Sequence, residues 1–417
     1  MKWQSNISSV CKNIIKHFPY EEKEEYEVND DTERTESEEI IRRINNNVFF
    51  EEFTFSKNNF ITPQRLQLEL ADNVVWIDDY VFIYQIKERD ESGTSSEETW
   101  FERTVLRKAI RQIKNSMKYL NKYSDINIPN ERNHIFNLAS LKNNYPHKIV
   151  IYKPGENLPD KIRFQKFYES SQVGLIHLFH SEDYYWICRY LYTPYEIDEY
   201  LKFRCELYKK HKSLMNKYPE QYVLGHFLET LDTDVIKERY IENVKTFEEN
   251  INDYDISGII SLLRDDMLNN GNPEGYYNIL KQLAKLERVE LSEFKKRFLK
   301  ILDNAINEKC SLPYRFVSIN TGCGFVFITG EPSQMDHYDI GLRNFTEAHK
   351  YDQKLDKCIG VIVFHIPKEN KYRIYFCYVE HPWEFNERMA NILKNNFPFL
   401  KMTVDLKYRY HMKNKRD

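Results

Sequence analysis

One carboxylate, one carboxamide and one ammonium group are spaced so that a single β-hairpin would bring them together. They are Asp72, Gln85 and Lys87, which we call the trio. Carboxylate and carboxamide oxygens are ligands that suit a hard divalent cation such as Mg²⁺. A bound divalent ion polarises phosphoryl oxygens and lowers the pKa of a water molecule, and a nearby lysine can stabilise developing negative charge. The three residue types therefore fit the hydrolysis of a phosphodiester bond.

Two apolar runs of sequence would position the trio. Residues 73–77 and 80–86 are rich in Val, Ile and aromatic residues, and Asp78-Asp79 separates them at a turn-forming step. With a two-residue loop between the runs, Asp72 lies opposite Gln85. Side chains alternate between the faces of a strand, so Lys87 lies on the same face as Gln85. Asp72, on the neighbouring strand opposite Gln85, lies on that face too. A polar trio at the end of an apolar hairpin is costly unless something uses it, so we predict a functional site there.

An Asp, a loop and then (Asp/Glu/Gln)-x-Lys on the next strand resembles the PD-(D/E)xK nuclease superfamily, which has the restriction-endonuclease-like fold. Here the motif is Asp72…Gln85-Ile86-Lys87, and its glutamine resembles the variant of the Mrr-type restriction branch. The resemblance covers mainly residues 35–200. It implies a Mg²⁺- or Mn²⁺-dependent endonuclease that hydrolyses DNA, with a role in bacterial anti-phage defence. In such enzymes the acidic residue and its neighbours hold the metal, and the lysine orients or activates the attacking water.

The glutamine removes one negative charge from the family pattern, so another acid must help to hold the metal. Glu69 precedes Asp72 by three residues, which would place it on the opposite face of a regular strand unless the strand bulges. Glu38 begins an amphipathic helix, and the family often carries a glutamate on the helix before its first strand. Residues 35–38 (TESE) also fit a capping box, so Glu38 remains open between helix cap and metal ligand.

A long basic helix is expected after the hairpin, because apolar residues recur at helical spacing over residues 100–123. Related nucleases often place a Gln or Lys of this helix near the metal, which makes Gln112 and Lys108 secondary candidates. Like charges on one helix face repel mildly, but they become favourable along a phosphate backbone, where they release counterions. An ordinary solvated helix face is the alternative. The basic residues recur at steps of three or four and form one stripe, which we call the basic stripe: Arg103, Arg107, Arg111, Lys114, Lys118 and Lys122.

Composition limits the class of protein. The chain has 417 residues, enough for two or three domains, and its net charge is −4. No apolar run approaches the length that spans a bilayer, and the first residues lack a signal-peptide pattern, so we expect a cytoplasmic protein without membrane contacts. The seven cysteines are scattered with no CxxC pair, which argues against a zinc or disulfide framework.

The expected fold class is α/β, with a restriction-endonuclease-like mixed sheet flanked by helices, followed by a helical region and a small C-terminal α/β domain. The helical and C-terminal parts would supply recognition, or contacts with a protein partner or a second copy of the chain. In the first domain we expect a helix over 37–47, a strand over 49–55, the hairpin, and buried strands over 148–152 and 173–179. The expected domains are an acidic segment 1–34, a nuclease-like domain 35–215, a helical region 216–310 and an α/β domain 311–417 with a basic tail.

Two alternatives to a DNA endonuclease remain open. The glutamine of the trio would also suit a weakened metal site in a non-catalytic subunit that keeps the nuclease fold and binds nucleic acid or a partner. The 30 Tyr and 26 Phe residues would suit stacking on single-stranded RNA, although they follow the periodicity of a packed core.

Overall fold

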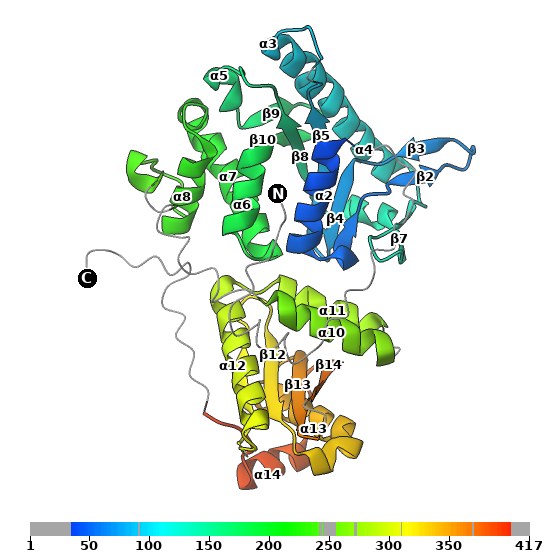
Figure 1. Ribbon diagram of the computed structural model, residues 1–417, viewed down its shortest axis with the longest axis vertical. Coiled ribbons are helices and arrows are strands. Elements are labelled where there is room, and N and C mark those ends of the chain that lie inside the picture. The colour runs from blue at the N-terminus through cyan, green and yellow to red at the C-terminus, as the bar shows by residue number, and fades with distance from the viewer. Residues whose placement is uncertain are drawn as a thin grey trace. The chain divides into compact units, whose positions relative to one another are not determined.

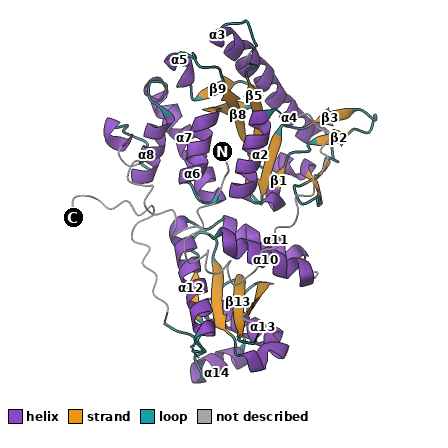
Figure 2. Cartoon of the chain, in the orientation of Figure 1, coloured by secondary structure: helices purple, strands orange, loops and turns teal. Residues whose placement is uncertain are grey.

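The computed structural model describes residues 35–401 except 91, 242, 243, 245–255, 271, 272, 310, 369 and 370. The chain divides into two compact units, one over Asn29–Glu248 and one that contains Glu249–Asp417 (Figure 1). Each unit has one main sheet with helices packed against it, so the protein is a mixed α/β protein (Figure 2). The expected acidic segment 1–34 and the basic tail beyond residue 401 lie outside the described residues.

The first unit is built on a six-stranded mixed sheet with the strand order β1-β4-β5-β8-β10-β9. The three central strands β5, β8 and β10 are parallel, and the remaining pairings are antiparallel. The expectation of a mixed sheet is confirmed. The strands are β1 (Thr54–Phe55), β4 (Asn73–Ile77), β5 (Tyr80–Glu88), β8 (His147–Lys153), β9 (Phe167–Ser170) and β10 (Gly174–His180).

The β4–β5 hairpin has the predicted register. Ile77 pairs with Tyr80 and Asn73 pairs with Tyr84, so the loop contains only the two aspartates. Asp78 has a φ of 54°, in the left-handed region that tight turns need and that Asp tolerates. Extending this register by one pair beyond the end of β4 places residue 72 opposite residue 85.

Helices cover both faces of this sheet. On one face, α2 contacts β4 and β5, while α6 and α7 pack on β5, β8 and β10. On the other face, one long helical segment crosses β5 and β8, and it comprises α3, the π-helix η2 and α4. The helix α8 packs on α7 in the same unit. The bounds are α2 (Glu36–Phe49), α3 (Glu97–Trp100), η2 (Phe101–Ala109), α4 (Ile110–Lys122), α5 (Asp160–Arg163), α6 (Ser181–Tyr190), α7 (Pro194–Met215) and α8 (Glu220–Glu229).

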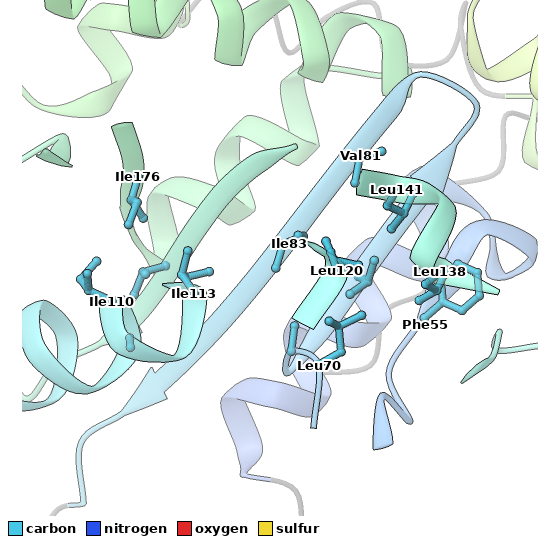
Figure 3. Close-up of a cluster of buried hydrophobic side chains, with 14 of the residues drawn as sticks. Phe55, Leu70, Val81, Ile83, Ile110, Ile113, Leu120, Leu138, Leu141 and Ile176 are labelled. Carbon is cyan, nitrogen blue, oxygen red and sulfur yellow. The ribbon is translucent and has the colours of Figure 1, made fainter. Parts of the chain in front are cut away.

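An apolar core fixes this helical segment on the sheet. Val81 and Ile83 of β5 belong to one buried apolar cluster with Ile110 and Ile113 of the helix and with Leu141 (Figure 3). The neighbours of these strand residues, such as Phe82, point to the α2 face instead, where the Phe82 ring lies 4.9 Å from that of Phe49. Successive side chains of β5 point to opposite faces of the sheet, so this strand packs against the helices on both faces.

The second unit contains a four-stranded sheet with the order β11-β12-β13-β14, in which β12 and β13 are parallel and the outer pairs are antiparallel. The helix α13 packs on β12 and β13, and α12 packs on the same two strands. The bounds are α10 (Ser257–Asn270), α11 (Pro273–Ala284), α12 (Arg288–Ile306), β11 (Tyr314–Val317), β12 (Cys323–Thr329), α13 (Tyr338–Asp352), β13 (Lys357–Ile366), β14 (Lys371–Glu380) and α14 (Glu387–Asn395).

One expected element of the first unit is wrong. The strand expected over 49–55 is mostly a helix end: α2 runs to Phe49, Phe50 has a φ of 64°, and a 3₁₀ turn occupies Glu51–Phe53. Only the last two residues of the range pair with β4. The packing of Phe49 against the sheet outweighs the strand propensity of this aromatic run. Short elements were also missed, and they are β2 (Asn59–Ile61), β3 (Gln67–Glu69), β6 (Asn127–Pro129) and β7 (Ile135–Asn137).

None of the helices within the described residues combines the length and the apolar character that crossing a bilayer requires.

Candidate active site

The structure brings the trio together at the open end of the β4–β5 hairpin. Oδ2 of Asp72 accepts a hydrogen bond from the backbone N–H of Ile86 at 2.6 Å and one from Nζ of Lys87 at 2.9 Å. The side chains of this ion pair are only 6% and 9% exposed for the aspartate and the lysine. A buried ion pair costs desolvation energy that its mutual attraction barely repays, so it is weak evidence for a structural role.

Three oxygen atoms converge on the ammonium group of Lys87. Besides Oδ2 of Asp72, Nζ donates to Oε1 of Gln85 at 3.3 Å and to the backbone carbonyl of Ile86 at 2.7 Å. One carboxylate, one carboxamide and one carbonyl oxygen are also the kind of ligands that a hard divalent cation takes. The lysine thus places its positive charge within a set of oxygens suited to a metal ion.

The carboxamide of Gln85 has two possible orientations, which differ in the hydrogen-bond partners that they offer. With its nitrogen facing Asp72, it donates to Oδ1 at 3.0 Å and to Oδ2 at 3.3 Å, and it also reaches Oε1 of Gln112 at 3.2 Å. In the other orientation, the oxygen of the Gln85 carboxamide accepts a hydrogen bond from Lys87 but faces the two carboxylate oxygens of Asp72. Gln85 is 2% exposed, so its carboxamide is shielded from bulk solvent.

The two secondary candidates on the basic helix have different environments. Gln112 lies within hydrogen-bond distance of Gln85, so it belongs to the cluster around the trio. Lys108 is exposed one helical turn earlier. The structure therefore places the glutamine at the site and leaves the lysine on the surface beside it.

Both candidate acids lie within electrostatic reach of one another. Partial desolvation raises the pKa of the Glu69 carboxyl, the negative charge of Asp72 raises it further, and Glu38 contributes in the same direction. Glu69 is the last residue of β3, and residues 70–72 belong to no strand, so strict alternation does not govern its direction. The expectation that it would face away from Asp72 rested on a continuous strand, which the structure does not contain.

Glu38 closes a helix cap. Its backbone N–H donates to Oγ1 of Thr35 at 3.3 Å, and its carboxylate accepts from the backbone N–H of Thr35 at 3.0 Å. The capping box expected for residues 35–38 is confirmed. The charge of Glu38 still raises the pKa of Glu69, so the cap and the acidic neighbourhood of the trio are parts of one region.

The basic stripe lies on the helical segment η2–α4, and its residues are exposed except for Lys114, which is half-buried. Arg107 forms an ion pair with Glu102 of the same helix, so part of its charge is already neutralised. Nζ of Lys122 lies 4.9 Å from the centre of the Tyr123 ring. An exposed row of cations is a suitable electrostatic footprint for a polyanion.

A buried polar network on the opposite face of the hairpin was not anticipated. Nδ2 of Asn45 donates to Oδ1 of Asn73 at 2.8 Å, and the hydroxyl of Tyr184 donates to Oδ1 of Asn45 at 2.7 Å. The network ties α2 and α6 to the residue that follows Asp72, and so it helps to fix the register on which the trio depends. The available signal was the position of Asn45 on the apolar side of its helix, beside Ile41 and Ile44.

The donor set fits a metal ion only if neutral oxygens take part. Among the described residues, no group of three or more His, Cys, Asp or Glu side chains could hold a metal ion. The candidate ligands are therefore Asp72, the carboxamide oxygen of Gln85 and the carbonyl of Ile86, and Glu69 is a further acid whose pKa responds to the charge of Asp72. This set suits Mg²⁺ or Mn²⁺, which accept oxygen ligands and water.

No protein-family model, curated protein or solved structure matches this chain. The geometry of the trio and its surroundings is therefore the basis on which a function can be assigned.

Proposed function

We propose that this protein is a metal-dependent nuclease that hydrolyses phosphodiester bonds of DNA. The observation that carries the proposal is the convergence of a carboxylate, a carboxamide and an ammonium group in a buried cluster at the open end of one hairpin. Burying these groups costs free energy, and apolar side chains of similar size would pack there at lower cost. The presence of these three groups there is explained if they act on a substrate.

In this proposal each group has a chemical task. Asp72 and Gln85 hold Mg²⁺ or Mn²⁺, and Glu69 or Glu38 adds the negative charge that the glutamine lacks. When bound, the ion supplies a polarised phosphoryl oxygen and a water molecule of lowered pKa. Lys87 donates hydrogen bonds to the negative charge that develops on the phosphoryl oxygens. Gln112 holds the carboxamide of Gln85 in one of its two orientations, and the basic stripe binds the phosphate backbone.

A second candidate function is a non-catalytic subunit that binds DNA through the same surface. One observation favours it: the ammonium of Lys87 already pairs with Oδ2 of Asp72 and donates to the carbonyl of Ile86, so its charge neutralises the cluster without any metal ion. The missing charge at Gln85 points in the same direction, because it lowers the attraction for a divalent ion.

Cleavage assays separate the two functions. The protein is incubated with plasmid, linear duplex DNA, single-stranded DNA and RNA in Mg²⁺, Mn²⁺ or EDTA, alongside the variants Asp72→Ala and Lys87→Ala. The matched control is Asp79→Ala, which removes an exposed carboxylate at the other end of the same hairpin. We expect metal-dependent DNA cleavage that both site variants lose and the control keeps.

Cleavage that survives both site substitutions would refute this site. DNA binding without cleavage of any substrate would favour the non-catalytic subunit, and cleavage of RNA alone would show that the substrate class is wrong.

A further inference from the structure

A cavity of about 220 Å³ lies in the first unit, between the N-terminal parts of β8 and β10 and the helix α7. Among the described residues, no aspartate or glutamate lines it. Its polar lining side chains each have a nitrogen or sulfur atom that can donate a hydrogen bond, and they are His147, Lys148, His177, Cys205 and Lys209. The cavity therefore suits a ligand that brings hydrogen-bond acceptors and negative charge.

The ammonium group of Lys148 is the unbalanced charge of this cavity. Burial lowers the pKa of Lys148, and the nearby sulfur of Cys205 acts in the opposite direction. Within the described residues, Nζ of Lys148 has no hydrogen-bond acceptor and no carboxylate partner. Burying an ammonium group without such a partner costs free energy. An anion bound in the cavity would remove that cost.

The other charges around the cavity are already paired. Nζ of Lys209 lies 2.6 Å from Oε1 of Glu206. Nε2 of His147 lies 3.0 Å from Oδ1 of Asp198, and Nζ of Lys202 lies 2.6 Å from the other oxygen of that carboxylate. The carboxylates of Glu206 and Asp198 are thus engaged by side chains other than Lys148.

The hydrogen-bonding direction of His177 is fixed by Arg204. Nη1 of Arg204 lies 3.2 Å from Nδ1 of His177, and a guanidinium can only donate, so Nδ1 accepts. Burial lowers the pKa of His177 well below its usual range, and the charge of Arg204 lowers it further, so the ring is neutral and Nε2 carries the proton. Nε2–H therefore donates to Sγ of Cys205, 3.5 Å away. Because His177 cannot take the proton of this thiol, a Cys–His nucleophile is excluded here.

The thiol of Cys205 adds a second donor beside Lys148. Burial raises the pKa of Cys205 to about 11, so the sulfur keeps its proton at neutral pH. Sγ accepts the hydrogen bond from His177, which leaves its own S–H available to a ligand. An ammonium group and a thiol thus line the same cavity with donor hydrogens.

A phosphate group matches these donors in charge and in number of acceptors. A phosphate monoester carries a charge of roughly −1.5 to −2 at pH 7 and three strong acceptor oxygens, whereas a carboxylate has one charge and two oxygens. Lysine is a common partner of phosphate groups in proteins. The cavity volume of about 220 Å³ is several times the ~30 Å³ of one water molecule and less than the ~300 Å³ of the smallest pockets for drug-sized ligands. It therefore has room for a phosphate group and a few further atoms.

We propose that this cavity binds the phosphate group of a small phosphate monoester or of inorganic phosphate. Nζ of Lys148 and the thiol of Cys205 donate hydrogen bonds to the phosphate oxygens. This site is separate from the trio and does not depend on the proposed nuclease function. His147 begins β8, whereas Gln85 of the trio pairs with Val150 of the same strand, about 10 Å further along.

Isothermal titration calorimetry tests this site on the full chain, in phosphate-free buffer with EDTA and at constant ionic strength. The ligands are inorganic phosphate and glycerol 3-phosphate, with glycerol as the uncharged comparison and acetate as the carboxylate comparison. The site variant is Lys148→Met, which keeps the length and the apolar stem of the lysine but removes the ammonium. The matched control is Lys142→Met, which removes an exposed lysine shortly before β8 in the chain.

We expect the wild-type protein to bind one phosphate group per chain in this cavity. Lys148→Met should weaken that binding about tenfold to a hundredfold, because it removes a hydrogen bond between charged groups. The control should bind like the wild-type protein, and glycerol should not bind. Tighter binding of glycerol 3-phosphate than of inorganic phosphate would identify a monoester as the ligand, and equal affinities would identify the phosphate group alone.

Thermal unfolding separates ligand binding by Lys148 from a structural role. In phosphate-free buffer, Lys148→Met should unfold at a higher temperature than the wild-type protein, because methionine is buried without the cost of an unpaired ammonium. Phosphate should raise the unfolding temperature of the wild-type protein and leave that of the variant unchanged.

Three results would overturn this assignment. The first is a wild-type protein that binds neither phosphate ligand, or a Lys148→Met variant that binds them as tightly as the wild-type protein does. The second is acetate binding as tight as phosphate binding, which would exclude a phosphate site. The third is a Lys148→Met variant that unfolds at a lower temperature in phosphate-free buffer, which would show that the ammonium stabilises the fold without a ligand. The nuclease proposal stands or falls separately, by DNA cleavage.

Discussion

Replacing Lys87 by Met should make the stability of the β4–β5 hairpin depend on divalent metal ions. Methionine keeps the length and the apolar stem of the lysine but removes the ammonium that lies 2.9 Å from Oδ2 of Asp72. Removing one partner of a buried ion pair costs about 3–5 kcal/mol. The carboxylate keeps its hydrogen bond from Ile86, so we expect a cost near the lower end, about 3 kcal/mol.

A divalent ion should restore what the substitution removes. At a free Mn²⁺ concentration 100 times its dissociation constant, binding stabilises the folded state by about 2.7 kcal/mol. The wild-type protein should gain less, because its own ammonium competes for the same oxygens. The double variant Asp72→Asn/Lys87→Met removes both charges, so it should recover much of the lost stability in EDTA and should not respond to Mn²⁺.

Hydrogen exchange followed by mass spectrometry measures this locally. In EDTA, peptides that cover residues 73–88 of Lys87→Met should lose about two orders of magnitude of protection, since about 1.4 kcal/mol corresponds to each tenfold change. Peptides that cover β13 (Lys357–Ile366) belong to the other compact unit and serve as the internal control. Unchanged protection of Lys87→Met in EDTA, or equal protection by Mn²⁺ in the single and double variants, would refute the reasoning.

Three further outcomes test the electrostatics of the first unit. Arg111→Ala and Lys118→Ala should each reduce the slope of log affinity for duplex DNA against log salt by about 0.9. Arg107→Ala should reduce that slope less, because Arg107 already pairs with a glutamate, and an equal reduction in all three variants would contradict this expectation. Glu220→Gln should lower the free energy of unfolding by about 3–5 kcal/mol in urea titrations, because it leaves the charge of the buried Arg204, now 2.7 Å from the carboxylate, without a counterion. Burial would raise the pKa of Glu220, but the charge of Arg204 outweighs the effect of burial and lowers the pKa from 4.5 to about 2. The stabilisation from the Glu220–Arg204 ion pair should therefore be complete above pH 4.5 and be lost between pH 4.5 and 2. The stability of Glu220→Gln should lack this loss between pH 4.5 and 2. Identical pH profiles of stability for the variant and the wild-type protein would contradict the assignment to Glu220.

Local patterns predicted the hairpin of the trio well. The two aspartates at the turn and the alternation of apolar residues determine the pairing of β4 with β5, and hence the meeting of Asp72 with Gln85. Both signals act over a few residues, so no distant contact is needed to read them. The basic stripe was equally accessible, because it depends only on helical spacing.

The remaining features depend on residues far apart in the chain. Phe50 leaves the helical region because Phe49 packs on Phe82, a contact that strand propensity cannot reveal. The β2–β3 hairpin is a local exception, and it was missed because each of its strands has only three residues. Capping spacing alone could not show that the charge of Glu38 acts on Glu69, because their proximity arises only when α2 packs against the sheet.

The π-helix Phe101–Ala109 gives this protein a place where its chain length can change. Each hydrogen bond of a π-helix spans one residue more than that of an α-helix, so the nine-residue segment holds surplus backbone per turn. We expect that deleting one residue there would tighten a turn to α spacing without breaking the helix. The deletion would rotate Arg103 and Arg107 about the helix axis while Arg111 and Gln112 keep their positions. Single-residue insertions and deletions are thus a route by which this helix can realign its surface charges against an unchanged candidate active site.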